Sequence, residues 1–179
     1  MPAHSAKSTT RRSRYNPPPP GAMVETTLAK LVAGRRLLRE DQTGNRTLDE
    51  SFERAIWYTG TAELLQRSCV AVVGTREPSA EGAARARRLA RELAAAGVVV
   101  VSGLANGIDT EALTSAMDAG GKVVGVIGTP LDESYPIVNA ELQERIAAEH
   151  LLVSQFRIGT RTFPEQLPAA QSRDGTVQS

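Results

Sequence analysis

Four short apolar runs with helical segments between them most constrain what this chain can fold into. In chain order the runs are V-A-V-V, V-V-V-V, V-V-G-V-I and L-L-V-S, and the helical patterns lie at residues 80–96, 110–119 and 140–149. Continuous β-branched runs that alternate with helices are typical of parallel strands covered on both faces. The sequence therefore predicts an α/β fold, a doubly wound and mostly parallel sheet with helices on both faces.

The first predicted helix shows a sheet-facing side. The apolar residues expected on that side are Ala86, Leu89, Ala90 and Leu93, at three- and four-residue spacing. The arginines of the same segment fall largely elsewhere, which indicates a solvated face. Glu81 precedes Arg85 by four residues, a spacing that favours a weak ion pair of about 0.2–0.5 kcal/mol.

Composition limits the classes of protein that remain. The 179 residues suffice for one domain with a full core, and 21 basic against 20 acidic residues leave a net charge of only +1, so a polyanion must be held by local charge. Cys69 is the single cysteine, which excludes an internal disulfide and a cysteine zinc site. No apolar run reaches the roughly 18–20 residues of a membrane span. We therefore expect a soluble protein of a reducing compartment, the cytoplasm.

Four segments are predicted along the chain. Residues 1–22 are basic and proline-rich, a composition typical of a disordered tail. Residues 23–55 are expected to be helical, with one helix from Glu25 to about Arg39 and a short one at residues 48–56. The α/β domain is expected at residues 56–164, and an irregular tail at 165–179.

The predicted ligand site lies where three strands end in glycine: Gly74, Gly103 and Gly128. In such folds ligands bind beyond the carboxyl ends of the strands, and the following helices point unpaired N–H groups at the same place, which suits an anion. Thr75, Arg76 and Ser79 supply the hydroxyl groups and the guanidinium that hold a phosphate. The alternative is that Ser79 only caps the next helix and that Arg76 pairs with Glu77 or another carboxylate in solvent.

The second and third loops add further candidates. Asn106 and Gly107 tolerate a left-handed backbone, and Asp109 is expected to cap a helix that begins at Thr110 rather than to act as an acid catalyst. The third loop supplies Thr129 and Tyr135, whose ring either stacks on a base or covers the loop.

Catalytic signatures are missing from the sequence. It has no dinucleotide fingerprint, no P-loop, no nucleophile elbow and no metal-ligand spacing, and neither His4 nor His150 suggests a catalytic dyad. The sequence predicts a binding protein without a metal or cofactor.

The longer motifs resemble a known family. A-V-V-G-T-R-E-P-S, V-V-S-G-L-A-N-G-I-D-T-E-A, G-T-P-L-D-E-S-Y-P-I-V-N-A-E-L and L-L-V-S-Q-F are similar to the Rossmann-like domain of the DNA processing protein A (DprA/Smf) family, from about Ile56 to Pro164. The resemblance implies a protein, not an enzyme, that binds and protects single-stranded DNA and loads the RecA recombinase during DNA uptake, natural transformation and recombination. It also implies that the loop of Gly74, Thr75, Arg76 and Ser79 holds a DNA phosphate.

The sequence departs from the family pattern in three places. Leu113 stands where the family usually has histidine, E-Q-L-P at residues 165–168 replaces a basic segment, and the chain ends at Ser179 before the C-terminal portion of typical members. Dimerisation and RecA contact in the family draw on that portion, so a homodimer and a RecA complex are weaker expectations. The alternatives are a nucleotide sensor, a phosphoribohydrolase-like enzyme, whose P-G-G-x-G-T motif is missing here, and a truncated copy without function.

Overall fold

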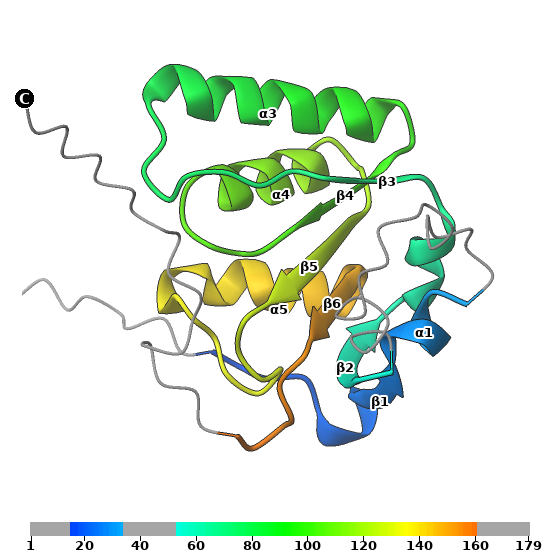
Figure 1. Cartoon of the computed structure of the whole chain (residues 1–179). Helices are drawn as coiled ribbons and strands as arrows, with labels where there is room; N and C mark the ends of the chain where they lie inside the picture. Colours follow the sequence, from blue (N-terminus) through cyan, green and yellow to red (C-terminus); the bar gives the residue numbers. More distant parts are fainter. Residues whose placement is uncertain (1–14, 34–52, 161–179) are drawn as a thin grey trace, which may run out of the picture.

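The computed structural model describes residues 15–33 and 53–160 of the chain. A six-stranded sheet runs through this part in the order β1-β2-β6-β5-β4-β3 (Figure 1). Its parallel strands are β3 (Cys69–Ala71), β4 (Val99–Ser102), β5 (Val123–Ile127) and β6 (Leu151–Ser154). The antiparallel strands are β2 (Ala55–Gly60), which pairs with β6, and β1 (Val24–Thr27), which pairs with β2. The predicted α/β fold with a mostly parallel sheet is confirmed.

Three long helices connect the parallel strands and pack on one face of the sheet. They are α3 (Ala80–Ala95), α4 (Ile108–Asp118) and α5 (Ala140–Glu149). Each parallel strand lies beside the one that follows it in the chain, and right-handed crossovers in one direction put every connecting helix on the same side. Residues of all three helices meet strand residues such as Val100, Val123 and Leu152 in one buried cluster.

The opposite face carries only short elements among the described residues. The four-residue helix α1 (Leu28–Leu31) and the 3-10 helix η2 (Ala62–Gln66) pack there against a smaller cluster that includes Val99, Val124 and Leu151. These short elements leave part of this face uncovered: Val73 is 73% exposed and Val126 is 48% exposed. Helices therefore lie on both faces, but within the described residues every crossover helix lies on one face, so the predicted double winding of the sheet is not found there.

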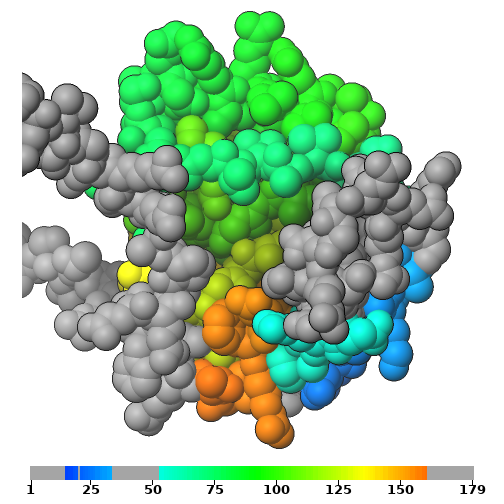
Figure 2. Space-filling model, viewed as in Figure 1, coloured from blue at the N-terminus to red at the C-terminus, as the bar shows by residue number. Residues whose placement is uncertain are grey.

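Helix α3 lies against α4, at the end of the molecule opposite to β1 and β2 (Figures 1 and 2). Its buried side is built from the small residues Ala83, Ala86 and Ala90, and Leu89, predicted on that side, is 44% exposed. Because alanines allow close approach, the two helices touch and the Arg87 guanidinium reaches Glu111 of α4 at 3.0 Å. The predicted ion pair between Glu81 and Arg85 is present.

The predicted helix from Glu25 is wrong at its start. Glu25 lies in β1 opposite Trp57, and only α1 is helical, with Thr27 as its cap through a hydrogen bond from the Lys30 N–H. Pairing with β2 gives residues 24–27 backbone hydrogen bonds along one edge, and this long-range partner outweighs a local helical pattern. Most of the remaining prediction, residues 34–39 and the short helix from residue 48, lies outside the described residues, while Ala55 begins β2.

The structure describes the last part, residues 15–22, of the segment predicted to be a disordered tail. Residues 15–22 lie against α5 and end in the 3-10 helix η1 (Pro20–Ala22), so this stretch is ordered rather than disordered. Residues 1–14 and 165–179 lie outside the described residues. None of the helices in the described part is long and apolar enough to cross a membrane.

Candidate functional site

Three loops follow the carboxyl ends of β3, β4 and β5. We name them loop 1 (residues 74–79), loop 2 (residues 103–107) and loop 3 (residues 128–136), and together they form the rim. The strands are parallel neighbours, so the three loops lie side by side at one edge of the sheet. Each loop begins at one of the glycines that the sequence singled out.

Loops 1 and 2 touch through their backbones. Gly107, the residue before α4, has a φ of +87°, and the next N–H, that of Ile108, donates to the Thr75 carbonyl oxygen at 3.1 Å. A Cβ at Gly107 would overlap that carbonyl oxygen and lie 2.7 Å from the carbonyl carbon of Arg76. Glycine is thus required here by both the conformation and the close approach.

Asp109 joins the same two loops with its side chain. One carboxylate oxygen accepts the Gly74 N–H at 3.3 Å and the other accepts the Gly103 N–H at 3.2 Å. Burial raises the pKa of this carboxyl above its usual value, although the hydrogen bonds from the two glycines act in the opposite direction. Asp109 lies inside the first turn of α4, which begins at Ile108, so the prediction that it caps a helix starting at Thr110 is wrong.

Loop 2 is also held by a residue of the short helix that follows loop 3. Leu104 is a non-glycine residue with φ +60°, and its side chain is 1% exposed. The side-chain amide of Asn139, in the 3-10 helix η3 (Ile137–Asn139), donates to the Leu104 carbonyl oxygen at 2.8 Å and to the Thr110 hydroxyl at 3.0 Å. A left-handed leucine is costly, and such residues cluster at functional sites.

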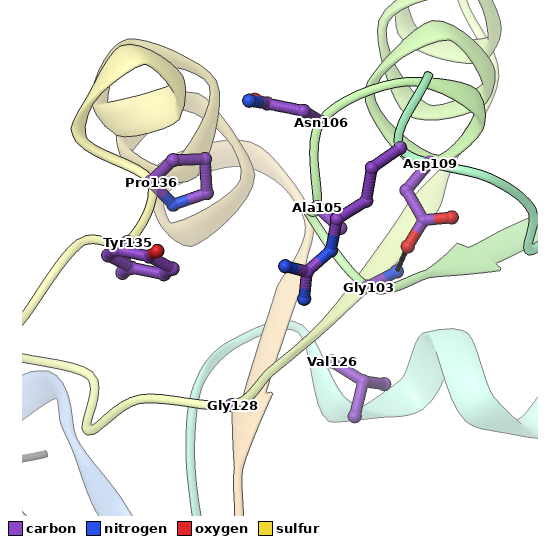
Figure 3. A pocket seen from close by; sticks show the side chains of 9 residues that line it. Gly103, Ala105, Asn106, Asp109, Val126, Gly128, Tyr135 and Pro136 are labelled. Atoms are coloured by element: carbon purple, nitrogen blue, oxygen red, sulfur yellow. Dashed lines mark hydrogen bonds between the residues drawn. The ribbon is translucent and has the colours of Figure 1, made fainter. Parts of the chain in front are cut away.

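A cavity of about 250 Å³ opens between the loops. It is lined by Arg76, Gly103, Ala105, Asn106, Asp109, Val126, Gly128, Tyr135 and Pro136. Tyr135 and Pro136 lie on one side, and Gly103 with the carboxylate of Asp109 on the other (Figure 3). The lining combines one guanidinium, one carboxylate already used by backbone N–H groups, an amide, a phenol and apolar surface.

Arg76 is exposed and makes no ion pair with any described carboxylate, so the alternative pairing with Glu77 is not seen. Its guanidinium is therefore available to an anion that enters the cavity. Tyr135 is 47% exposed and also lines the cavity, which leaves its ring accessible to a base or sugar.

The predicted site residues separate into two groups. Six of them line the cavity: Arg76, Gly103, Asn106, Asp109, Gly128 and Tyr135. Five do not, and these are Gly74, Thr75, Ser79, Gly107 and Thr129.

The three hydroxyl groups of the second group are used inside the protein. Ser79 caps α3 by accepting the Gly82 N–H at 3.1 Å, and Thr75 accepts the Glu77 N–H at 3.1 Å. Thr129 is 2% exposed and donates within its own loop to the Glu133 carbonyl oxygen at 3.4 Å. Of the predicted phosphate ligands, the side chains that bring a hydrogen-bond donor into this cavity are therefore Arg76 and Asn106.

Three lining residues were not predicted: Ala105, Val126 and Pro136. Ala105 and Pro136 are neighbours of predicted residues, and loop position alone was a sufficient signal for them. Val126 lies in β5 and faces the sparsely covered side of the sheet, so no loop motif points to it. Within the described residues there is no group of three or more histidine, cysteine, aspartate or glutamate side chains that could hold a metal ion.

The part of the chain that carries the rim matches a known protein family. The model of the family described as DNA recombination-mediator protein A matches residues 46–171. The DNA processing protein DprA of Streptococcus pneumoniae is 41% identical over 114 residues, which cover 64% of this chain and 40% of that protein. Protein Smf of a Synechocystis strain is 40% identical over 100 residues, 56% of this chain and 25% of that protein.

Solved structures agree with the sequence matches. The crystal structure of the S. pneumoniae protein matches with a TM-score of 0.58 at 40% identity, over 62% of this chain and 39% of that one. The DNA processing protein A of Helicobacter pylori, whose structure concerns a single-stranded DNA binding mode, matches with a TM-score of 0.57 at 30% identity, over 62% and 51% of the two chains. This chain therefore spans less than half the length of the two sequence relatives.

Proposed function

Because the chain belongs to the DNA recombination-mediator protein A family, we propose that it binds single-stranded DNA at the rim, with Arg76 as the clamp for a backbone phosphate. The single observation that carries the proposal is the placement of Arg76. It is an exposed guanidinium without a described carboxylate partner, and it lines a cavity beside the N-terminal end of α4. The relative from H. pylori binds single-stranded DNA, which supports the same ligand here.

The proposed contacts follow from the chemistry of the lining. A guanidinium offers two parallel N–H donors to phosphate oxygens, and Asn106 adds an amide donor. The carboxylate of Asp109 accepts from the two glycine N–H groups, which lowers its repulsion of a phosphate. Tyr135 and Val126 supply the accessible apolar surface on which a base or sugar packs without regard to sequence.

The wider role extends the proposal beyond this cavity. We propose that the bound strand is protected and handed to the RecA recombinase in DNA uptake or recombination, and that two copies of the chain associate. The resemblance to the family supports these steps, while the match covers only part of the relatives' length. We also propose that the protein acts without catalysis, since the cavity holds one carboxylate and that carboxylate is occupied by backbone N–H groups.

Fluorescence anisotropy of a labelled oligothymidine tests the clamp. Wild type is titrated beside Arg76→Ala and beside Arg88→Ala, a matched control whose guanidinium pairs with Glu92 on the exposed side of α3. Loss of one charged phosphate contact should weaken binding about 10- to 100-fold, and should lower the salt slope by about 0.7 log units per log unit of salt. Arg88→Ala should bind as the wild type does.

The same titration separates the alternatives. Equal affinity of the wild type and Arg76→Ala would refute the clamp. Displacement of the oligonucleotide by a mononucleotide at equal concentration would favour the nucleotide sensor, and release of free base from a nucleoside monophosphate would favour the phosphoribohydrolase-like enzyme.

A further inference from the structure

The segment of residues 15–22, which we name the strap, packs against α5 although it precedes the residues that the family model matches. The backbone N–H of Asn16 donates to the Glu144 carboxylate at 2.6 Å. The next three residues, Pro17, Pro18 and Pro19, line a pocket together with Ala147 and Ala148 of α5. The strap ends in η1, where the Ala22 N–H donates to the Pro19 carbonyl oxygen at 2.8 Å. These contacts fix the position of Tyr15 at the start of the strap.

Tyr15 is joined to loop 3 by its hydroxyl group. The hydroxyl donates to the Leu131 carbonyl oxygen at 2.6 Å and accepts from the side-chain amide of Gln143 at 2.9 Å. The same amide of Gln143, which is 1% exposed, donates to the Glu133 carbonyl oxygen at 2.9 Å. The side chains of Tyr15 and Gln143, which are hydrogen-bonded to each other, thus donate to two backbone carbonyl oxygens of loop 3.

The phenol must keep its proton to act as the donor to Leu131. Burial raises the pKa of Tyr15 to about 12. The hydrogen bond with Gln143 acts in the opposite direction, and the charges of Glu144 and Asp132 raise the pKa further. The hydroxyl therefore keeps its proton at neutral pH and can donate to Leu131. The bond also stabilises loop 3. Leu131 is fully buried, and without the Tyr15 hydroxyl its carbonyl oxygen would lose this hydrogen bond.

Loop 3 is the part of the rim that carries Gly128, Tyr135 and Pro136 into the cavity. Leu131 and Glu133 lie between these lining residues, so the bonds from Tyr15 and Gln143 act on the middle of the loop. We propose that Tyr15 is a positioning residue of the site: through its hydroxyl it holds residues 128–136 in the form that lines the cavity. As a statement about DNA binding, this inference rests on the proposed function.

The experiment compares Tyr15→Phe with wild type and with Tyr58→Phe. The first variant keeps the ring and removes the hydroxyl. The control removes the hydroxyl of a half-buried tyrosine in β2 that packs on the other face of the sheet and does not line the cavity. Two quantities are measured: amide hydrogen exchange of peptides that cover residues 129–136, and the Kd for oligothymidine by anisotropy.

Tyr15→Phe should speed exchange in residues 129–136 and weaken oligothymidine binding, each by about three- to tenfold, while Tyr58→Phe changes neither. Unchanged exchange in loop 3 would overturn the inference, as would faster exchange spread evenly over the molecule, because that result indicates only global destabilisation. If wild type fails to bind oligothymidine, the proposed function is refuted, and the exchange arm still decides whether Tyr15 positions the loop.

Discussion

The side-chain amide of Asn139 holds the carbonyl oxygen of Leu104, 2.8 Å away, while Leu104 keeps a left-handed backbone at φ +60°. The two residues belong to different parts of the chain, and their bond connects loop 2 to the start of α5. Together with the bonds of Asp109 to Gly74 and Gly103, it makes the rim one connected unit. The geometry of the cavity therefore depends on residues that do not line it.

Asn139→Asp tests this connection. The aspartate is nearly identical in shape, but it places an oxygen where the amide donor faced the Leu104 carbonyl oxygen. We expect the free energy of unfolding to fall by about 1–3 kcal/mol and oligothymidine binding to weaken with it. Urea denaturation measures the first quantity, and an unfolding midpoint equal to that of wild type would contradict the expected role.

Gly107→Ala should destabilise the protein more than Gly120→Ala. Both glycines have positive φ, at +87° and +76°, but a Cβ at Gly107 would overlap the backbone of loop 1, whereas a Cβ at Gly120 meets nothing within 4 Å. Backbone strain alone should cost about 1–2 kcal/mol at a left-handed position, and at least as much at Gly107, whose ψ of −131° lies outside the left-handed helical region. The overlap at Gly107 should add about 1–3 kcal/mol. Denaturant unfolding measures both variants, and an equal loss of unfolding free energy in the two would show that loops 1 and 2 move apart without cost.

Ser79→Ala distinguishes a helix cap from a phosphate ligand. Because the Ser79 hydroxyl accepts the Gly82 N–H, its removal should lower the free energy of unfolding by about 0.5–2 kcal/mol. DNA affinity should stay within about twofold of wild type, because a twofold change corresponds to less free energy than one weak hydrogen bond contributes. The opposite result, weaker binding at unchanged stability, would show that the Ser79 hydroxyl acts as a phosphate ligand.

Stability should fall in mild acid because of His150. Its side chain is 4% exposed, and burial, followed by the charge of Lys122, lowers its pKa in the folded state below the usual 6.5. Glu149 acts in the opposite direction and Arg145 in the same one. The unfolded chain therefore takes up a proton first as pH falls below 6.5, so the contribution of His150 is complete above that pH and decreases below it.

Urea denaturation between pH 5 and 7.5 measures this effect. The slope attributable to His150 should reach at most about 1.4 kcal/mol per pH unit. His150→Gln should flatten the profile in this window, while replacement of the only other histidine, His4→Gln, should leave it unchanged. A wild-type profile that is flat from pH 5 to 7.5 would contradict the assignment.

Local patterns predicted the four parallel strands and their connecting helices well. The bounds of α5 agree with the sequence, and α3 differs from its prediction by one residue, because their caps and periodicity are local properties. Helix α4 begins two residues earlier than predicted, since Gly107 rather than Asp109 makes the turn into it. Glu25 was misplaced because its strand depends on pairing with β2, which no local pattern contains.

The site was predictable to the level of the rim and not to the level of its hydrogen bonds. Strand ends and glycines located the three loops, and Arg76 and Tyr135 line the cavity between them. The sequence could not show that the hydroxyls of Thr75 and Ser79 bond to nearby N–H groups, because the same residues serve equally as ligands and as caps. Nor could it bring Tyr15 to Leu131, a contact between segments far apart in the chain.

The strand order also determines which steps of folding are local. Each parallel pair, from β3 with β4 to β5 with β6, joins strands separated by a single α-helix. Only the pairing of β2 with β6 must close a loop that contains the whole parallel unit. Loop closure becomes more costly with length, and non-local pairing slows folding. We therefore expect the parallel unit to assemble first and β1 and β2 to dock on it afterwards, with loop 3 held in its final form only when Tyr15 has reached Leu131.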